Sequence, residues 1–244
     1  MLNGKTILIT GASRGIGRAT AKLAKSYGAN VIVHGKTDSE NLQSIARELG
    51  AEKVVFDIGN QEQVLSSINK LIDKGIHING LANIAGIVYA SEPLDVKDED
   101  WINVFKTNVL GIMHTCQAVI PEMQKMKSGK IVNVASVRAY AQGTLASRLP
   151  YCVSKASVVN MTVALAKEYA KDGIYINSVS PGGVDTDIAK TWDEETKQRN
   201  TDVLLKRLGK PEEIGEVICF LLSDKSDYVI GQDYLVDGGY LVNR

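Results

Sequence analysis

The sequence predicts an α/β fold, a doubly wound parallel sheet covered by helices on both faces, in a single domain over residues 1–244. Short β-rich segments alternate with amphipathic segments of helical length, which is the pattern of successive βαβ units. A glycine-rich turn connects the first strand-like segment to the first helical one. No proline- or serine-rich linker divides the 244 residues, and their 44% hydrophobic content suffices for one sizeable core.

The first half of the chain is expected to hold four strands and three helices. Gly28 and Gly50 directly follow the first two helices, where glycine commonly ends a helix. Right-handed crossovers between such units give the doubly wound open sheet. The expected strands cover residues 6–10, 31–33, 54–56 and 78–82, and the expected helices cover 16–27, 39–49 and 61–73.

The second half continues the alternation with longer helices. Pro211 stands in the first turn of the last helix, a position that proline favours. Residues 184–208 are polar, lack a strong period and follow a strand end, so we expect them to form a flexible lid over the substrate. The expected helices cover 98–126, with Gly111 inside, 150–171 and 211–222, and the expected strands cover 130–135, 174–179 and 233–236.

The composition argues against several classes of function. Lys+Arg and Asp+Glu number 28 each, and this balance gives no sign of nucleic-acid capture. The N-terminus lacks the layout of a signal peptide, and the apolar runs are too short for a membrane span. Cys116, Cys152 and Cys219 show no metal-ligand spacing and are expected to be reduced, mostly buried thiols. We therefore expect a cytoplasmic protein that binds no metal, no nucleic acid and no membrane.

The turn after the first strand, residues 10–17, reads Thr-Gly-Ala-Ser-Arg-Gly-Ile-Gly. Gly11 allows a tight turn, Gly15 lets the backbone approach a pyrophosphate, and Gly17 permits close packing of helix against strand. The next helix begins with unsatisfied N–H groups and the positive end of its dipole, both of which favour phosphates. On the first strand–turn–helix of a βαβ chain, this motif predicts a nucleotide site.

The end of the second strand indicates which nucleotide is bound. A carboxylate at this place would accept hydrogen bonds from a ribose 2′-hydroxyl and repel a 2′-phosphate. The chain instead has Lys36 there, with no carboxylate before Asp38, and Arg14 adds a second cation in the glycine turn. These cations can pair with a 2′-phosphate, which favours NADP(H) over NAD(H). Both could also be ordinary solvated cations.

Tyr151 and Lys155 stand four residues apart in the expected helix 150–171, so the phenol and the ammonium can point into the same cleft. A nearby cation stabilises the phenolate and lowers the pKa of the tyrosine, which allows acid/base work near neutral pH. The same spacing also fits a surface tyrosine and a solvated lysine on an amphipathic helix. The rest of the chain decides between the two interpretations.

Two polar residues support the catalytic interpretation. Ser136 directly follows the expected strand 130–135, at the carboxyl edge where ligands bind in such sheets. Asn108 lies in the middle of the expected helix 98–126, where asparagine is a poor helix former. Taken alone, Ser136 also fits a turn or helix cap, and Asn108 also fits a tolerated exposed residue.

Together these motifs resemble the short-chain dehydrogenase/reductase family, in its form of about 250 residues with one Rossmann domain. The resemblance spans essentially the whole chain and is strongest to the 3-oxoacyl-[acyl-carrier-protein] reductases. It implies an NAD(P)-dependent oxidoreductase acting on a ketone or a secondary alcohol, and a homotetramer. The motifs that carry it are the turn 10–17, Asn83-Ile84-Ala85-Gly86, Asn108, Ser136, Tyr151 with Lys155, and Pro181-Gly182.

The resemblance also implies roles for individual residues. Tyr151 exchanges the proton on the substrate oxygen, and Lys155 lowers the pKa of the phenol and holds the nicotinamide ribose. Ser136 binds the substrate carbonyl, and Asn108 positions a water at a helix irregularity. The remaining expected cofactor contacts come from Gly11, Ser13, Arg14, Gly15, Ile16, Gly17, Lys36, Asp57, Ile58, Asn83, Ala85, Gly86, Pro181, Gly182, Val184 and Thr186.

The chain departs from the family pattern in places that bear on the substrate. The family's usual doubled asparagine is Asn83-Ile84 here, and the loop 136–151 is two residues longer than in many carrier-protein reductases, with Arg138, Tyr140 and Arg148 inside. Asp172 occupies a position that is often basic in those enzymes.

A 3-oxoacyl thioester, with an acyl-carrier protein as partner, is the leading substrate. Lys125, Lys127 and Lys130 are the candidates for the basic patch that would receive this acidic carrier protein. A sugar, a polyol, a steroid or another small secondary alcohol is the alternative. A nucleotide-binding protein without catalysis is a third, which the intact catalytic set argues against.

Overall fold

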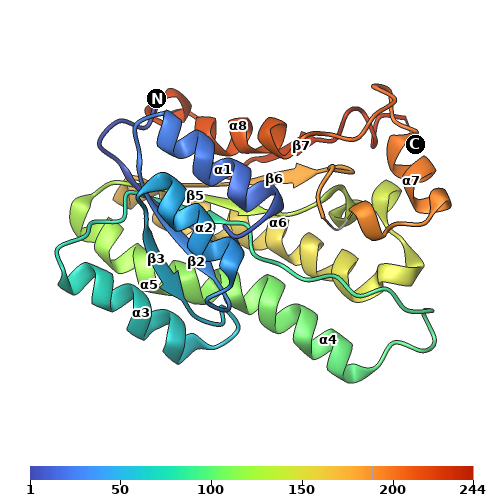
Figure 1. Ribbon diagram of the computed structural model, residues 1–244, viewed down its shortest axis with the longest axis horizontal. Helices are drawn as coiled ribbons and strands as arrows, with labels where there is room; N and C mark the ends of the chain where they lie inside the picture. The colour runs from blue at the N-terminus through green and yellow to red at the C-terminus, as the bar shows by residue number, and fades with distance from the viewer. Residues whose placement is uncertain (188, 244) are drawn as a thin grey trace.

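The computed structural model describes residues 1–187 and 189–243 and has a single seven-stranded sheet at its centre (Figure 1). Every neighbouring pair of strands runs parallel, in the order β3-β2-β1-β4-β5-β6-β7. This order reverses direction between β1 and β4, as expected for a doubly wound sheet. The strands are β1 (Thr6–Ile9), β2 (Asn30–Gly35), β3 (Glu52–Val55), β4 (Gly80–Asn83), β5 (Gly129–Val134), β6 (Ile174–Pro181) and β7 (Asp233–Val236).

Helices cover both faces of the sheet, and the sheet divides the hydrophobic core into two halves. Alternate residues of β1 point to opposite faces, so Ile7 and Ile9 belong to one buried cluster and Leu8 to the other. Figure 1 shows α1 and α8 on one side and α3 and α4 on the other. This confirms the three-layer α/β fold. The α-helices are α1 (Gly15–Ser26), α2 (Glu40–Leu49), α3 (Gln61–Asp73), α4 (Asp98–Phe105), α5 (Gly111–Met126), α6 (Leu149–Tyr169), α7 (Glu194–Thr201) and α8 (Pro211–Leu221).

The expected helix 98–126 is interrupted in the structure. A π-helical turn, Lys106–Leu110, separates α4 from α5. Asn108 lies in this turn, and its side chain is fully buried and bonded to a neighbouring loop. Such single turns are uncommon and frequently occur at functional sites. The alternative interpretation of Asn108 as an exposed residue is therefore wrong.

Helix α7 lies within the expected lid and was missed because its sequence has no apolar face. It is stabilised locally instead: Asp193 caps it by accepting from the Thr196 N–H at 2.8 Å. Glu194 pairs with Lys197 at 2.7 Å, and Glu195 pairs with Arg199 at 2.6 Å. The expected lid also includes Ile188, which lies outside the described residues.

The helical run Ala146–Asp172, which contains α6, is long and apolar enough by composition to cross a membrane. It packs against the sheet, and Val158 and Ala166 belong to the buried cluster on that face. Helices that cover parallel sheets are apolar for this reason. We therefore interpret this run as a core helix of the domain.

Candidate functional site

Two connected cavities lie at the carboxyl edge of the sheet. We call them the inner cavity, of about 200 Å³, and the outer cleft, of about 680 Å³. The glycine turn lines the outer cleft, and the loop after β5 lines the inner cavity. The residues common to both are Ile16, Ile84, Gly86, Ile87 and Thr186.

The outer cleft is built on close approaches of backbone to backbone. Gly11 has φ +68°, and a Cβ there would lie 2.9 Å from the Cα of Ala85. A Cβ on Gly17 would lie 2.1 Å from the carbonyl oxygen of Gly11, so larger residues cannot replace either glycine without moving the turn. The hydroxyl of Thr10 accepts from the N–H groups of Ile84 and Ala85, at 2.9 and 3.1 Å, which joins the glycine turn to the loop after β4.

This cradle fits a dinucleotide. The helix that follows it, α1, offers its N-terminal N–H groups to the cleft, because Arg14, Gly15 and Ile16 line it. At its far end the cleft carries Lys36, whose ammonium is 2.9 Å from the Asp57 carboxylate and whose side chain is 72% exposed. The other predicted cofactor residues that line this cleft are Gly11, Ser13, Gly17, Asp57, Ile58, Ala85, Gly86 and Thr186.

His34 supports the glycine turn, although the sequence did not point to it. The ring is buried between the turn and β3: Nδ1 accepts from the Gly11 N–H at 3.3 Å, and Nε2 donates to the Phe56 carbonyl at 2.9 Å. This arrangement requires a neutral ring. Burial lowers the pKa of His34 from 6.5 to about 4, against a smaller opposing effect of the bond to Phe56.

We expect stability to fall in acid because of His34. Its pKa is lower in the folded chain than in the unfolded one, so the unfolded state takes up the proton first as the pH falls below 6.5. The loss should amount to about 2 kcal/mol between pH 7.5 and pH 5. Denaturant unfolding at both pH values measures it. His34→Gln should flatten this pH dependence, whereas His77→Gln, at an exposed position, should preserve it. A wild-type slope retained in His34→Gln would contradict this assignment.

The inner cavity brings Ser136, Tyr151 and Lys155 together beside the shared wall. The Lys155 ammonium is buried and donates to the Val134 carbonyl at 2.7 Å, and it lies 5.6 Å from the centre of the Tyr151 ring. Burial lowers the pKa of Lys155 to about 8. Pro181, Gly182, Val184 and Thr186 line the same cavity, as the sequence predicts.

The surroundings of Tyr151 raise the pKa of its phenol rather than lowering it. Burial raises the pKa of Tyr151 above its ordinary value of 10.0. The groups that oppose this rise are Ser136, through a hydrogen bond, and then the guanidinium groups of Arg138 and Arg148. The cations that oppose the rise come from the loop after β5, while Lys155 lies 5.6 Å from the centre of the Tyr151 ring; a lower phenol pKa caused by Lys155 stays a prediction.

Asn108 lies behind the inner cavity rather than in it. Its amide accepts from the Ile87 N–H at 2.8 Å and donates to the Ile87 carbonyl at 2.9 Å and to the Ser154 hydroxyl at 3.1 Å. A Cβ on Gly86 would lie 3.2 Å from Asn108 Oδ1 and 3.6 Å from Lys155 Nζ, so the two side chains flank this glycine. Asn108 thus holds the loop after β4 against α6.

Asn83 is the predicted cofactor residue that lines neither cavity. Its side chain points into the core, where it donates to Asn133 at 2.9 Å and accepts from Thr115 at 2.8 Å. The reason is strand alternation: Asn83 is the last residue of β4, and the next residue, Ile84, faces the cavities instead. A direct contact of the Asn83 side chain with a cofactor is therefore not supported.

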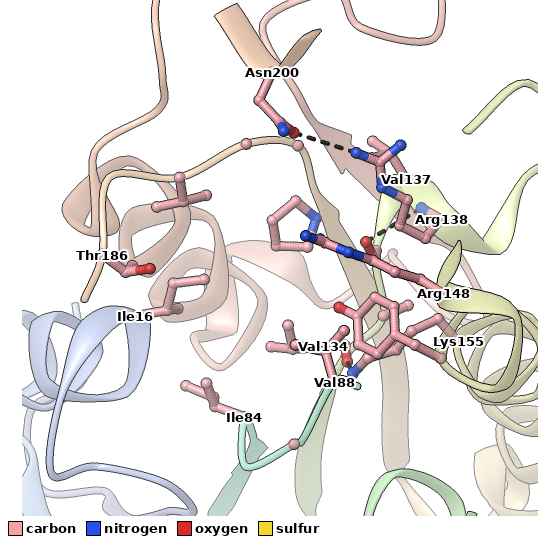
Figure 2. Close-up of a pocket in the computed structure, with 18 of the residues that line it drawn as sticks. Ile16, Ile84, Val88, Val134, Val137, Arg138, Arg148, Lys155, Thr186 and Asn200 are labelled. Atoms are coloured by element: carbon pink, nitrogen blue, oxygen red, sulfur yellow. Dashed lines mark hydrogen bonds between the residues drawn. The ribbon is translucent and has the colours of Figure 1, made fainter. Parts of the chain in front are cut away.

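Two lining residues of the inner cavity, Trp192 and Asn200, come from the polar region after β6 and were not singled out in the sequence. Arg138 and Arg148 also line it, and they come from the long loop 136–151, where the chain departs from the family pattern. Arg138 is buried and donates to the Gly143 carbonyl, the Tyr240 hydroxyl and Asn200 Oδ1. Figure 2 shows Arg148 reaching into the cavity from the side that carries Lys155, with Ile16 and Thr186 across from it.

The expected basic patch for an acyl-carrier protein is not at this site. Lys130 is the second residue of β5, so it lies at the amino edge of the sheet, opposite the cavities, and it is buried against Asp227 at 2.7 Å. Lys125 and Lys127 end the helix that leads into the same edge. Lys127 pairs with Asp172 at 3.1 Å, and Lys125 lies 3.3 Å from a Glu122 oxygen. The prediction that these three lysines form a basic patch near the cleft is therefore wrong.

Comparisons with known proteins relate the whole chain to oxidoreductases. The profile of the enoyl-(acyl carrier protein) reductase family matches residues 11–241. The chain is 37% identical to a 3-oxoacyl-[acyl-carrier-protein] reductase of Thermotoga maritima, over 99% of both chains. A protein described as a gluconate dehydrogenase of Agrobacterium tumefaciens has a TM-score of 0.93 at 33% identity, covering 98% of this chain and 97% of its own. A gluconate 5-dehydrogenase of Burkholderia cenocepacia, solved with NADP and tartrate, has a TM-score of 0.93 at 28% identity, covering 99% and 96%.

Proposed function

The chain belongs to the short-chain dehydrogenase/reductase family, and from that premise we propose that it interconverts a ketone and a secondary alcohol with NADP(H), using Tyr151 as the acid/base. It is an NAD(P)-dependent oxidoreductase. One observation carries the proposal: Ser136, Tyr151 and Lys155 gather on the inner cavity where it joins the glycine-lined cleft. A reacting carbonyl in that cavity lies between a proton donor and the place of a nicotinamide.

In the direction of reduction, a dihydronicotinamide held by the glycine turn and Lys155 would supply the hydride that the carbonyl carbon accepts. Tyr151 donates its proton to the carbonyl oxygen, so the C=O π bond is replaced by one C–H and one O–H bond. Because burial raises the pKa of Tyr151, the phenol holds its proton at neutral pH and is ready to act as the acid. Ser136 orients the carbonyl, and Arg138, Arg148 and Ser136 stabilise the phenolate that remains.

Lys155 and Asn108 take supporting roles in this mechanism. The Lys155 ammonium keeps two donors free after its bond to Val134, and these can hold the hydroxyls of the nicotinamide ribose. Asn108 fixes the loop that carries Gly86 and Ile87 at the junction of the two cavities. A water positioned by Asn108 for a proton relay stays a prediction.

The cofactor preference for NADP(H) is proposed from charge. Arg14 and Lys36 line the outer cleft at the expected place of the adenine ribose, and the nearby Asp57 is already paired with Lys36. A 2′-phosphate would therefore meet two cations and only one carboxylate, which is partly neutralised. The Burkholderia gluconate 5-dehydrogenase, a similar structure, holds NADP, which supports the same choice.

Lys36→Asp should reverse this preference. The substitution puts two carboxylates, at positions 36 and 57, beside the expected 2′-phosphate, so the ratio of kcat/KM with NADPH to that with NADH should fall by about tenfold or more. Steady-state rates with both cofactors measure the ratio. Lys70→Asp, an exposed charge reversal on α3, is the matched control and should leave it unchanged. An unaltered ratio in Lys36→Asp would mean that Lys36 does not reach the phosphate.

Two substrate classes have specific support. The name of the Thermotoga relative favours a 3-oxoacyl thioester, presented by an acyl-carrier protein. The polar wall of the inner cavity, with Arg138, Arg148 and Asn200, favours a small oxygenated substrate such as a sugar acid, and the two gluconate dehydrogenases are similar structures. Rates with acetoacetyl thioesters, keto-gluconates, sugars and cyclic ketones, each with NADPH and NADH, separate the classes. Failure to turn over any ketone or alcohol would remove the proposed activity.

Two further expectations stay proposals. The lid at 184–208 is supported by Val184, Thr186, Trp192 and Asn200, which come from this segment and line the inner cavity. The homotetramer is supported by apolar side chains exposed on the helices expected to form the interfaces, Ile102 and Leu110 around α4 and Val153 on α6.

A further inference from the structure

Two guanidinium groups in the inner cavity lack an acidic partner among the described residues. Arg138 is buried, and its bonds go to the neutral oxygens of Gly143, Tyr240 and Asn200. The side chain of Arg148 makes no hydrogen bond or salt bridge to any residue that the structure describes. It is nevertheless partly buried, and burial lowers its pKa, as does the nearby Arg138.

A partly buried charge without a partner costs stability, and chains rarely keep one unless something compensates it. The charged groups near Arg148 are two arginines and one aspartate. Arg138 and Arg199 repel it, and Arg199 is itself paired with Glu195. Asp193 and Arg148 both line a second cavity next to the inner one. The carboxylate of Asp193 is engaged in capping α7 through the Thr196 N–H. Among the described residues no carboxylate forms an ion pair with Arg148, so the cavity carries a guanidinium without a paired anion.

A second unsatisfied donor lines the same cavity. The indole Nε1 of Trp192 is buried and has no hydrogen-bond partner among the described residues. Buried N–H groups of this kind are rare in folded proteins, and each calls for an explanation such as a bound water, an ion or a functional role. Arg148 and Trp192 also line the second cavity next to the inner one, so both side chains border the two cavities.

Arg148 is placed where it would act on the substrate. It caps α6 one helical turn before Tyr151, and it interacts electrostatically with the phenol. A group bound by Arg148 would therefore lie close to a carbonyl that meets Tyr151 and Ser136. A guanidinium fork matches two oxygens of a carboxylate or a phosphate, and it forms stronger hydrogen bonds with them than with neutral acceptors.

We propose that the substrate of this enzyme carries an anionic group, a carboxylate or a phosphate, which binds Arg148 in the inner cavity beside the reacting carbon. This inference rests on the proposed function for the statement that the bound molecule is the substrate. The anion site itself rests only on the cavity and its unpaired donors.

Direct binding to the cofactor-loaded enzyme tests the site. Calorimetry with protein saturated by NADP⁺ should detect binding of tartrate. Binding of threitol, the neutral counterpart of tartrate, should be far weaker. Glycerol 3-phosphate compared with glycerol forms the phosphate arm and tells which anion is preferred. Arg148→Gln should weaken binding of the preferred anion by about tenfold or more, and Arg148→Lys should weaken it less. Arg47→Gln, an exposed position on α2, is the matched control.

Two results would overturn the inference: equal anion binding by wild type and Arg148→Gln, or no advantage of the anions over their neutral counterparts. Thermal unfolding separates a binding role from a structural one. Because the Arg148 side chain has no hydrogen bond or ion pair to the described part of the chain, Arg148→Gln should not lower the melting temperature of the cofactor-free protein.

Steady-state kinetics test whether the anion that Arg148 binds is part of the substrate. For acetoacetate and its ethyl ester, the ratio of kcat/KM for the anion to that for the ester should exceed one in wild type and fall about tenfold in Arg148→Gln. A ratio that Arg148→Gln leaves unchanged contradicts the inference while the proposed reductase activity stands. If no ketone is reduced, the proposed function fails and the binding measurements still decide whether Arg148 holds an anion.

Discussion

Replacing Tyr151 with phenylalanine should lower kcat by about three orders of magnitude and leave cofactor affinity close to that of wild type. The substitution removes one hydroxyl from the inner cavity, and with it the only proposed proton donor to the carbonyl oxygen. The ring remains, so the packing against Lys155 and Ser136 is retained. Turnover of the best ketone from the substrate panel and fluorescence titration with NADPH measure the two quantities.

Tyr228→Phe is the matched control, because it deletes the same atom from a fully exposed side chain. It should match wild type in both measurements. Near-normal turnover in Tyr151→Phe would falsify the acid/base assignment. A loss of cofactor binding as large as the loss of turnover would instead indicate that the substitution disturbs the whole site.

Replacing Asn108 with leucine should lower both stability and activity. The side chain is fully buried and satisfies the N–H and the carbonyl of Ile87 as well as contacting Ser154. Leucine leaves these groups without partners, which should cost about 2 kcal/mol of folding free energy and lower the melting temperature by roughly 5 °C. Because Ile87 belongs to both cavities, its displacement should also lower kcat/KM by about a hundredfold.

The control for this variant is Asn69→Leu, the same change at an exposed position of α3. Thermal unfolding and steady-state kinetics of both variants give the comparison. If Asn108→Leu were as stable and as active as wild type, the π-helical turn would have no part in holding the loop. A loss of activity without a loss of stability would favour the water-positioning role over the structural one.

Much of the fold follows from local patterns in the chain. The helix Gln61–Asp73 and the strand Asp233–Val236 have the bounds that their sequences predict. Ser39 accepts from the Leu42 N–H at the start of α2, and Gly50 ends that helix with φ +56°. These signals are readable because capping and chain reversal depend on residues within a few positions of each other.

The cofactor cradle and the Tyr151–Lys155 pair are predictable for the same reason. Gly11, Gly15 and Gly17 act within one turn, and residues four apart on a helix share a face wherever the helix lies. The glycine turn and the Tyr151–Lys155 pair make up most of the candidate site. Both can be predicted without knowing which segments of the chain pack against each other.

Only the tertiary structure decided the charges and the direction of side chains at the site. Burial raises the pKa of Tyr151, and arginines from the loop after β5 oppose that rise. Likewise, Asn83 points into the core, and Lys130 lies at the opposite edge of the sheet.

The amino-acid sequence by itself determined the family, the order of strands and helices, and the residue types at the reacting centre. The folded arrangement determined which of those residues are buried, which are paired, and that Arg148 forms no ion pair with the residues the structure describes. The physical reason is that the energy of a charge depends on solvent and on neighbours from distant parts of the chain, and these are brought together only on folding.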